Sequence, residues 1–474
     1  MKLRPGFQIP STGLSSPVVF CVGLPLLVFA PLIRGGNRAV ALMLLIAFAL
    51  ALLVFVAASL GKDAGRGQGM DTDRRGLTLP ALVLALSPLW VALLQLVPVP
   101  WGLWIGLPGH EPYVGALEAV QALPIGWLPA SLIPDATWIS ALAGLPIAAM
   151  FLLALLVTNK QLAALTQALA LIAFFQSIVG LLQVSLFKVL YFDAMAYERA
   201  IGSFANPNHY AAFIAMVLPL TIVHLRTRLD HRATPSAGGR GSLAAAMWSA
   251  VLFVQLAGLL ASISRAGVMV GVLIALLTVV LLPMRDLDRR SRWWRLAGLA
   301  ALALLVLATV GFQGMASRLA DLGSDSGRAL MFRGTWQGAL TFWRFGSGLG
   351  TFAGVFPRFQ PSGLSGLVEY AHSDYVQLLM ECGLLFVVLV SLAGALAARQ
   401  SMRLIGWLRN DPSKRVALMQ AASGLGLLAV FLHSWVDFNL RIPAVAMTAA
   451  FLFGAFLRPV GVAEQDDARH HARN

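Results

Sequence analysis

Four short polar clusters interrupt an otherwise apolar sequence and hold the residue types that could do chemistry. They are RAIGSFANPN at 199–208, SISRAG at 262–267, HSDY at 372–375 and HSWVDFNLR at 433–441. Arginine binds phosphate oxygens through paired N–H donors, and histidine can take up a proton near neutral pH. The clusters therefore predict a site that holds an anionic group beside a proton acceptor.

Composition fixes the class of protein in which this site must form. Hydrophobic residues make up 58% of the 474 residues and charged residues 12%, with a mean hydropathy of +0.78. Soluble domains carry roughly 25% charge, so we expect an integral membrane protein. The net charge of +14 is spread between apolar runs, which argues against nucleic-acid binding. The two cysteines lie in apolar segments, which argues against a disulfide framework or a cysteine metal site.

Apolar segments of a length that crosses about 30 Å of hydrocarbon predict an all-α bundle of about twelve transmembrane helices. They span 17–33, 37–60, 79–97, 136–157, 161–187, 209–227, 244–263, 266–283, 295–313, 373–398, 416–433 and 441–458. We divide the chain into an N-terminal tail (1–16), N-terminal helices (17–160), a membrane region that contains the four polar clusters and the outer loop 314–371 (161–458), and a polar tail (459–474). The first apolar run has no cleavage pattern, so we expect it to be retained.

Lysine and arginine gather in alternate connecting segments, and this bias favours a cytoplasmic location for both chain ends. The outer segment 98–135 has no Lys or Arg and is rich in Trp and Pro, which indicates interfacial or re-entrant structure. The outer loop 314–371 is the longest segment outside the spans. Within it Phe332, Trp336, Leu340 and Trp343 recur at helical spacing, which predicts an amphipathic helix over about 329–344 that lies on the outer leaflet or caps a cavity.

In this topology each polar cluster lies at the outer face, where a helix begins. Asn208, and Ser373 with Asp374, are candidate N-caps. Arg265 lies in a very short turn, and Pro443 suits a first helical turn. Helix N-termini favour anions, and arginine is costly near lipid unless it has a partner. We therefore expect an extracytoplasmic site for a phosphate-bearing, lipid-linked molecule.

Several of these residues have a purely structural alternative. Arg199 could be an interfacial residue whose charge reaches the headgroups. His372 could cap a helix, and His433 and Asp437 could pair to fix a helix hairpin. Arg328 and Arg333 could contact either a ligand or lipid headgroups.

The clusters give the chain a resemblance to the bacterial O-antigen ligase and polymerase family of membrane glycosyltransferases. The resemblance covers about Phe174 to Leu457. It rests on RAIGSFANPNHYAAF at 199–213, SRAG at 264–267, GSGLGTFAGVFPRFQ at 346–360 and AHSDYVQLLMECGLLF at 371–386. It implies a C-type glycosyltransferase-like membrane fold that needs no metal or other cofactor. It also implies that Arg199 and Arg265 bind the donor diphosphate and that His372 is the general base. Many family members have Asn where this chain has Ser373, and Asp374 could orient the imidazole.

The resemblance implies transfer of a glycan from undecaprenyl diphosphate to a sugar hydroxyl at the periplasmic face of the inner membrane. We favour a ligase that uses lipid A core as acceptor. The alternatives are a polymerase that extends a lipid-linked repeat, an O-linking transferase with a protein acceptor and, from another class, a lipid-linked glycan transporter or flippase. The candidate supporting residues are Asn206, Asn208, Asp374, Tyr375, Arg328, Arg333, His433, Asp437 and Arg441.

Overall fold

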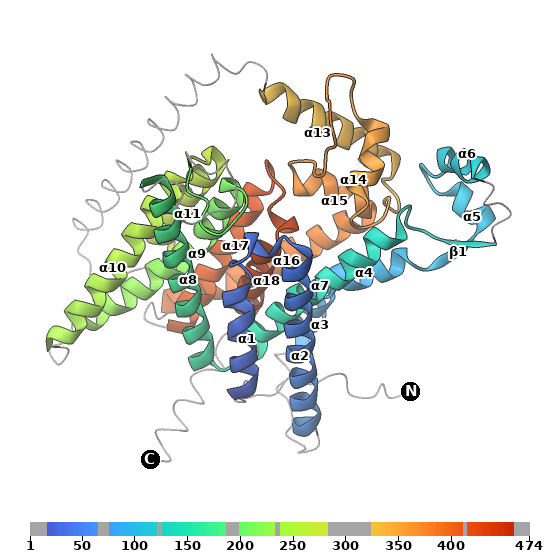
Figure 1. Cartoon of the computed structure of the whole chain (residues 1–474). Helices are drawn as coiled ribbons and strands as arrows, with labels where there is room; N and C mark the ends of the chain where they lie inside the picture. Colours follow the sequence, from blue (N-terminus) through green and yellow to red (C-terminus); the bar gives the residue numbers. More distant parts are fainter. Residues whose placement is uncertain are drawn as a thin grey trace.

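The computed structural model describes residues 17–64, 75–120, 126–185, 199–232, 238–282, 324–410 and 415–458. These segments are almost entirely helical (Figure 1). In the N-terminal part the elements are α1 (Pro17–Phe29), η1 (Arg34–Gly36), α2 (Ala39–Ala64), α3 (Arg75–Ala85), α4 (Ser87–Gln95), β1 (Pro98–Pro100), α5 (Trp101–Gly106), α6 (Glu111–Ala119), β2 (Trp127–Pro129) and α7 (Pro134–Leu156). They are followed by α8 (Asn159–Ser185), α9 (Pro207–Arg232), α10 (Gly238–Ala261), α11 (Arg265–Leu281), α13 (Ser324–Thr341), α14 (Phe352–Val355), η5 (Phe356–Phe359), α15 (Asp374–Cys382), α16 (Leu384–Asn410), α17 (Arg415–His433), η6 (Asn439–Arg441) and α18 (Pro443–Leu457).

The predicted class, a helical protein with many membrane spans, is confirmed. Among the described residues, seven helices are long and apolar enough to cross a membrane: α2, α7, α8, α9, α10, α16 and α17. Apolar helices of 10–17 residues also occur in α1, α11 and α18. The span expected at 295–313, the N-terminal tail 1–16 and the polar tail 459–474 lie outside the described residues.

Two predicted spans are each broken into two helices. The span expected at 79–97 is α3 and α4, which separate just before Pro88 in the first turn of α4. The span expected at 373–398 is α15 and α16, which separate at Gly383. Gly383 has a φ of 59°, and a side chain there would meet the backbone carbonyl of Trp343 at 2.7 Å. Glycine tolerates this conformation and this close approach.

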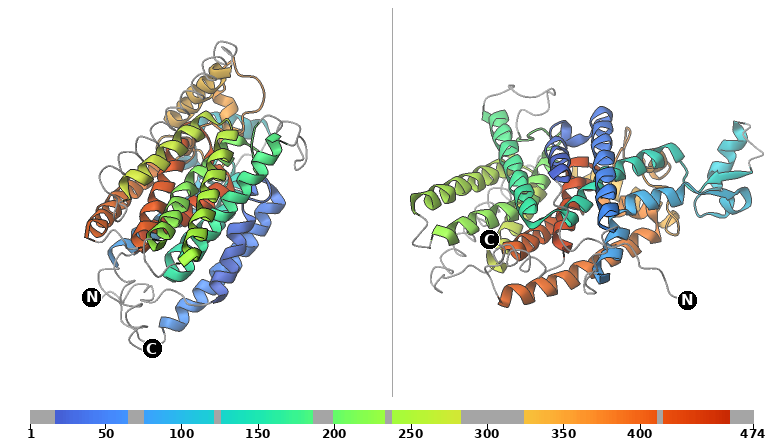
Figure 2. Two further views of the ribbon diagram at one scale, coloured as in Figure 1. Left: turned by 90° about the vertical axis from the view of Figure 1, so that its left-hand side faces the viewer. Right: turned by 90° about the horizontal axis from the view of Figure 1, so that it is seen from below.

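Helix α9 forms the centre of the bundle. Its apolar window is 89% buried, whereas that of α16 is 11% buried and faces outward. Helices α8, α10, α11 and α17 pack against α9, and α7 packs along α18. Figure 2 shows these helices side by side in the tilted bundle. A Cβ at Gly426 of α17 would collide with the Met216 carbonyl of α9, so glycine lets the two backbones approach closely.

The segment expected to be interfacial, 98–135, projects from one side of the bundle (Figure 1). Its strands β1 and β2 pair antiparallel, with Val99 opposite Leu128. The indole N–H of Trp104 donates to the carbonyl of Pro129 (2.9 Å), and Arg358 donates to the carbonyl of Gly109 (2.8 Å). The second contact joins this projection to the segment that follows α13.

The predicted amphipathic helix of the long loop is α13. Its small residues Gly334, Thr335, Gly338 and Ala339 are buried against the protein. The aromatic stripe instead faces away from the protein, with Phe332 45% and Trp336 44% exposed. An apolar face turned outward on a membrane protein is suited to contact with lipid.

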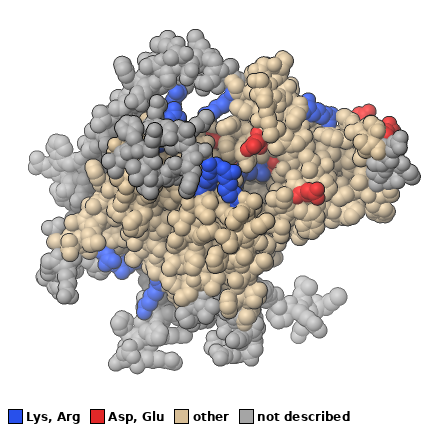
Figure 3. Space-filling model, in the orientation of Figure 1, with Lys and Arg blue, Asp and Glu red and all other residues tan. Residues whose placement is uncertain are grey.

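Charged side chains are sparse on the described surface. In Figure 3 the Lys, Arg, Asp and Glu atoms gather mainly in the upper half of the molecule, at the level of α13 and α15 in Figure 1. A broad band below them is almost free of charge, as a hydrocarbon environment requires.

Candidate functional site

Two glutamines of α8 hold the loop that carries Arg199. Gln183 donates to the carbonyl of Gly202 (2.7 Å) and accepts from the N–H of Ile201 (3.1 Å). Gln176 accepts from the backbone N–H of Ser203 (2.8 Å). The Ser203 hydroxyl also donates to the carbonyl of Pro31, which follows α1. The loop therefore has a defined path, fixed in part by the N-terminal helices.

Asn206 rather than Asn208 caps α9. The Asn206 side-chain oxygen accepts from the backbone N–H of Asn208 (2.8 Å), which corrects the sequence-based choice of cap. Pro207 occupies the first helical position and needs no N–H partner. The side chain of Asn208 is therefore available for contacts with other segments.

A serine-rich turn positions Arg265 at the first residue of α11. The Ser262 hydroxyl accepts from the backbone N–H of Ser264 (3.2 Å), and Ile263 has a φ of 50°. Ser264 is the N-cap of α11 and accepts from the N–H of Gly267 (3.3 Å). A Cβ at Gly267 would collide with Ala211 of α9, so the glycine allows α11 to approach α9 closely.

The segments that carry Arg199 and Arg265 lie side by side. The N–H of Ala200 donates to the carbonyl of Ala261 at the end of α10 (2.8 Å). The Ser264 hydroxyl donates to the side-chain oxygen of Asn208 (2.7 Å). Both arginines are exposed. Two cations and the N-termini of α9 and α11 are thus gathered at one face, hereafter the site face.

His372 precedes α15 in an unusual backbone conformation. Its φ is 52°, a region that residues with a side chain rarely adopt. The neighbouring N–H of Ala371 donates to the side-chain oxygen of Gln377 (3.0 Å), which ties the loop to α15. The imidazole ring meets the Phe438 ring edge to face, with centroids 5.0 Å apart. Its side chain is 28% exposed, so one side remains accessible.

Asp437 connects the four sequence clusters. Its Oδ1 lies 3.4 Å from Nδ1 of His372, and its Oδ2 accepts from the side-chain amide of Asn208 (2.6 Å). Its backbone carbonyl accepts from the N–H of Asp374 (3.3 Å). Through Asn208 it is also linked to Ser264 and so to the turn of Arg265. Residues 229 positions apart in the chain thus meet at one carboxylate.

The surroundings of Asp437 favour its ionised form. Burial opposes ionisation, but the neighbouring His372 ring, the nearby His209 and the N–H of Phe438 outweigh it. Together they hold the pKa of Asp437 below its ordinary range. A fixed anion beside one imidazole nitrogen orients the ring and leaves the other nitrogen for a substrate proton.

His209 belongs to this cluster but was not among the predicted site residues. It is buried at the start of α9, and its Nε2 lies 3.9 Å from Oδ1 of Asp437. Its ring packs on the same Phe438 ring as His372 does. Its position directly after Asn206-Pro207-Asn208 was the available signal, because it shares the helix start with Asn208.

A buried ion-pair network lies behind His372. Arg441 donates to Oε2 of Glu381 (2.7 Å), and its Nε lies 4.0 Å from Oδ1 of Asp374. Asp374 also accepts from the N–H of Leu440 (2.9 Å). Burial is the main cause that raises the pKa of Asp374 to about 7. The network joins α15 to the η6 segment and so fixes the loops on both sides of His372 and Asp437.

Glu381 is a second residue that sequence reasoning missed. It is fully buried, and its Oε1 also accepts from the N–H of Phe352 (3.3 Å) and from Gln377 (3.2 Å). A carboxylate within an apolar helix was the available signal, since charges in such segments are rarely retained without a partner.

Comparison with known protein families matches residues 250–391 to the O-antigen ligase family. The chain thus contains a region that is similar to the O-antigen ligase family. The matched region runs from α10 into α16 and includes Arg265 and His372, whereas Arg199 and Asp437 lie outside it. No curated protein matches the chain.

The match to the O-antigen ligase family indicates an O-antigen ligase or polymerase type of function, and with it glycosyltransferase activity. It also indicates lipid-linked glycans and membrane lipids as the general class of partners. Together with the apolar helices, it describes a multi-pass membrane protein.

The remaining predicted site residues lie around the cluster of His372 and Asp437. Tyr375 points toward α17: its hydroxyl donates to the carbonyl of Phe431 (3.0 Å), and its ring stacks on Trp435 with centroids 4.5 Å apart. Arg328 and Arg333 are exposed on α13, and Arg328 is close enough for its charge to act on His433.

The expected hairpin pair of His433 and Asp437 is not formed. His433 is buried, and among the described residues neither of its ring nitrogens has a hydrogen-bond partner. Asp437 is instead engaged by Asn208 and His372. No group of three or more His, Cys, Asp or Glu side chains in the described ranges is arranged to hold a metal ion.

Proposed function

We propose that this protein transfers a glycan from undecaprenyl diphosphate to a sugar hydroxyl of lipid A core at the periplasmic face of the bacterial inner membrane. The observation that carries the proposal is the pairing of His372 with Asp437, linked through Asn208 and Ser264 to the turn of Arg265. This arrangement places a proton acceptor near a site for an anionic leaving group. The match of residues 250–391 to the O-antigen ligase family supports the type of reaction.

Arg199 and Arg265 bind the donor diphosphate in this proposal. Guanidinium groups form paired, charge-assisted hydrogen bonds with phosphate oxygens. The N-termini of α9 and α11 add backbone N–H donors and a partial positive charge. Negative charge on the diphosphate grows as its bond to the anomeric carbon breaks, and fixed cations stabilise that charge. Such screening makes the diphosphate a good leaving group without protonation.

His372 acts as the general base. Asp437 holds Nδ1, so Nε2 takes the proton from the acceptor hydroxyl as its oxygen forms a bond to the anomeric carbon. The bond from this carbon to the diphosphate oxygen breaks on the opposite side, and undecaprenyl diphosphate departs with the electron pair. Attack from the side opposite the leaving group inverts the configuration of the anomeric carbon. No metal and no other cofactor takes part in these steps.

Helix α13 covers the site in this mechanism. Arg328 of α13 lies near His433, and the small residues of the helix pack on the protein below. A cover of this kind excludes water, which would otherwise compete with the acceptor and hydrolyse the donor. Arg328 and Arg333 face outward and are suited to contact the phosphate groups of either substrate.

The test is reconstituted transfer with the purified full chain and no added metal. Undecaprenyl-diphosphate-linked glycan is the donor, and lipid A core and a second lipid-linked repeat are offered separately as acceptors. Products are resolved by gel electrophoresis and mass spectrometry. Transfer to lipid A core that His372→Ala abolishes supports the ligase proposal. A ladder on the lipid-linked repeat instead makes the protein a polymerase. Donor movement across vesicles without any transfer overturns the enzyme proposal in favour of transport.

A further inference from the structure

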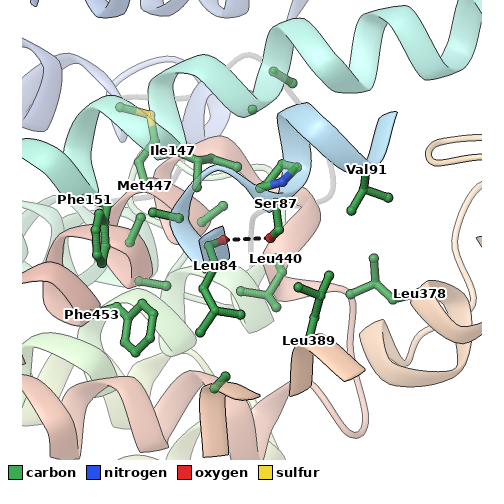
Figure 4. Close-up of a pocket in the computed structure, with 18 of the residues that line it drawn as sticks. Leu84, Ser87, Val91, Ile147, Phe151, Leu378, Leu389, Leu440, Met447 and Phe453 are labelled. Carbon is green, nitrogen blue, oxygen red and sulfur yellow. Dashed lines mark hydrogen bonds between the residues drawn. The ribbon is translucent and has the colours of Figure 1, made fainter. Parts of the chain in front are cut away.

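An apolar cavity lies beside the candidate site and takes no part in the chemistry described above. It has a volume of about 410 Å³, within the range of small-ligand pockets. Its walls come from α3, α4, α7, α15, α16, α17 and α18. Figure 4 shows Leu84, Ile147, Phe151, Leu389 and Phe453 around the empty space.

The cavity offers almost no polar contact. Arg441 is its one charged lining residue, and its guanidinium is already engaged by Glu381 and Asp374. The Ser87 hydroxyl donates to the carbonyl of Leu84 (2.7 Å), the bond drawn in Figure 4. Protein interiors are close-packed, and an apolar space without polar partners does not hold water well. These walls are therefore suited to a hydrocarbon.

The depth of the cavity matches one leaflet of a bilayer. It is lined along α18 from Pro443 to Phe453 and along α7 from Ser140 to Phe151. At 1.5 Å per residue each stretch covers about 15 Å, which is half of the roughly 30 Å hydrocarbon core. Both helices begin at the site face, so the cavity runs along them from the side of that face into the bundle. One acyl chain of a lipid in that leaflet fits this depth, whereas an undecaprenyl chain is several times longer.

The end of the cavity at the site face is next to the candidate base. Leu440 and Arg441 line it, and both contact Asp374, two residues after His372. The segments that carry Arg199 and Arg265 contribute no lining residue. His372 is thus linked through Asp437 and Asn208 to the proposed donor segments, and its neighbour Asp374 contacts the residues at the end of the cavity. A lipid held by its chain in the cavity would therefore have its headgroup near the base.

We infer that this cavity binds one acyl chain of the acceptor lipid and so positions an acylated acceptor beside His372. The inference deepens the proposed function and rests on it. It also separates the two acceptors considered, because lipid A carries acyl chains and a second undecaprenyl-linked repeat does not.

Photocrosslinking tests the cavity without requiring turnover. The full chain in nanodiscs is exposed to lipid A with a diazirine in one acyl chain and, separately, to undecaprenyl diphosphate with a diazirine in its prenyl chain. Labelled peptides are then located by mass spectrometry. We expect the lipid A probe to label α7, α16 or α18, excess unlabelled lipid A to suppress this labelling, and excess phosphatidylglycerol to leave most of it.

Variants that fill the cavity provide the matched comparison. Ala393→Phe on α16 and Ala450→Phe on α18 place a ring in the cavity, whereas Ala395→Phe places the same ring on the exposed side of α16. We expect the first two to lower labelling about tenfold, because overpacking excludes the chain, and the third to leave it unchanged. Two cavity-filling variants are used so that the comparison can still be made if one of them fails to fold.

Three results would overturn the inference: equal labelling in Ala393→Phe and Ala395→Phe, labelling of these walls by the prenyl probe instead, or equal competition by phosphatidylglycerol. The last result would identify a structural phospholipid. Transfer is measured separately, so loss of the proposed function and loss of this binding site are distinguishable.

Discussion

His372 and Asp437 face each other at the site face, with Nδ1 of the histidine 3.4 Å from Oδ1 of the aspartate. The aspartate is 1% exposed and the histidine 28%, so a buried anion supports a partly accessible imidazole. A carboxylate that holds one ring nitrogen fixes both the orientation and the tautomer of the ring. The same relationship occurs in enzymes that use histidine as a base, on unrelated folds.

Removal of the base should abolish transfer without loss of donor binding. We expect His372→Ala to lower the transfer rate by about 10²- to 10⁴-fold, the usual contribution of general base catalysis. Donor affinity, measured by titration of undecaprenyl diphosphate, should change by less than about threefold, since we propose that Arg199 and Arg265 bind the diphosphate. A large loss of donor affinity would instead place His372 in the donor site.

Removal of the carboxylate charge should have a smaller but clear effect. We expect Asp437→Asn to lower the rate by about 10- to 100-fold, as for other carboxylates that orient a histidine. The Asn208 contact can persist through the remaining carbonyl oxygen, so the fold should be retained. Single-turnover transfer is the measurement. An unchanged rate would mean that Asp437 only joins the helices.

Composition and helix-start chemistry made part of this site predictable. The turn of Arg265 was evident because a polar SISRAG segment between apolar runs leaves room only for a tight connection. The amphipathic helix in the long loop was evident from its aromatic spacing. Both features depend on residues near one another in the chain, so the sequence alone carries the information.

The contacts between distant segments were not predictable in the same way. Asn208 was taken as a cap, but Asn206 caps α9 and leaves Asn208 to bind Asp437. His433 was expected to pair with Asp437, four residues away. In the folded chain His372 lies beside Asp437 instead. Glu381 was not identified because its partner Arg441 lies 60 residues further along the chain. Such pairings depend on how the helices pack, which spacing in a single sequence does not encode.

The pH dependence of stability should distinguish Asp374 from Asp437. Burial raises the pKa of Asp374 to about 7, so the folded state binds a proton more tightly than the unfolded state does. Its stabilising contribution is then full below the ordinary aspartate pKa near 3.9 and is lost as pH rises through about 7. We expect the melting temperature of the wild type to fall from pH 6 to pH 8 relative to that of Asp374→Asn.

Asp437 serves as the control in this experiment. Its pKa is lowered, so it is ionised in both the folded and the unfolded state between pH 6 and pH 8. The titration of the Asp437 carboxylate therefore contributes no slope of its own over this window, and the difference in melting temperature between the wild type and Asp437→Asn should vary less with pH than the difference for Asp374→Asn. A slope as steep as that of Asp374→Asn would show that the pH dependence arises from another group.

We expect Arg265 to determine donor affinity. A different positively charged residue at this position should not fully restore that affinity. We expect Arg265→Ala to weaken binding of undecaprenyl diphosphate by about 10- to 100-fold, the range for lost charge-assisted hydrogen bonds. Arg265→Lys should recover only part of this loss, because lysine lacks the paired donors. Arg409→Ala, at the exposed end of α16, is the control and should bind normally. Full recovery with lysine would contradict recognition by paired donors.

Gly267 should be required for the close packing of α11 on α9 that positions Arg265. A Cβ at this position would collide with Ala211 and would lie 3.0 Å from the Ser264 hydroxyl, the cap of α11. We expect Gly267→Ala to lower the free energy of unfolding by about 1–3 kcal/mol, the usual range for overpacking, and to weaken donor binding as α11 shifts. Denaturant unfolding and donor titration are the two measurements.

Two further variants separate packing from the general effect of alanine in a helix. Gly394→Ala on α16 adds a methyl group that meets no atom within 4 Å, so it should not destabilise the protein. The double variant Ala211→Gly/Gly267→Ala removes the methyl group of residue 211 on α9, which leaves room for the methyl group added at residue 267 on α11. It should recover much of the lost stability and donor affinity. The recovery should be incomplete, since glycine within α9 itself costs about 0.5–1 kcal/mol. If the double variant is no better than Gly267→Ala, contact with Ala211 is not what positions Arg265.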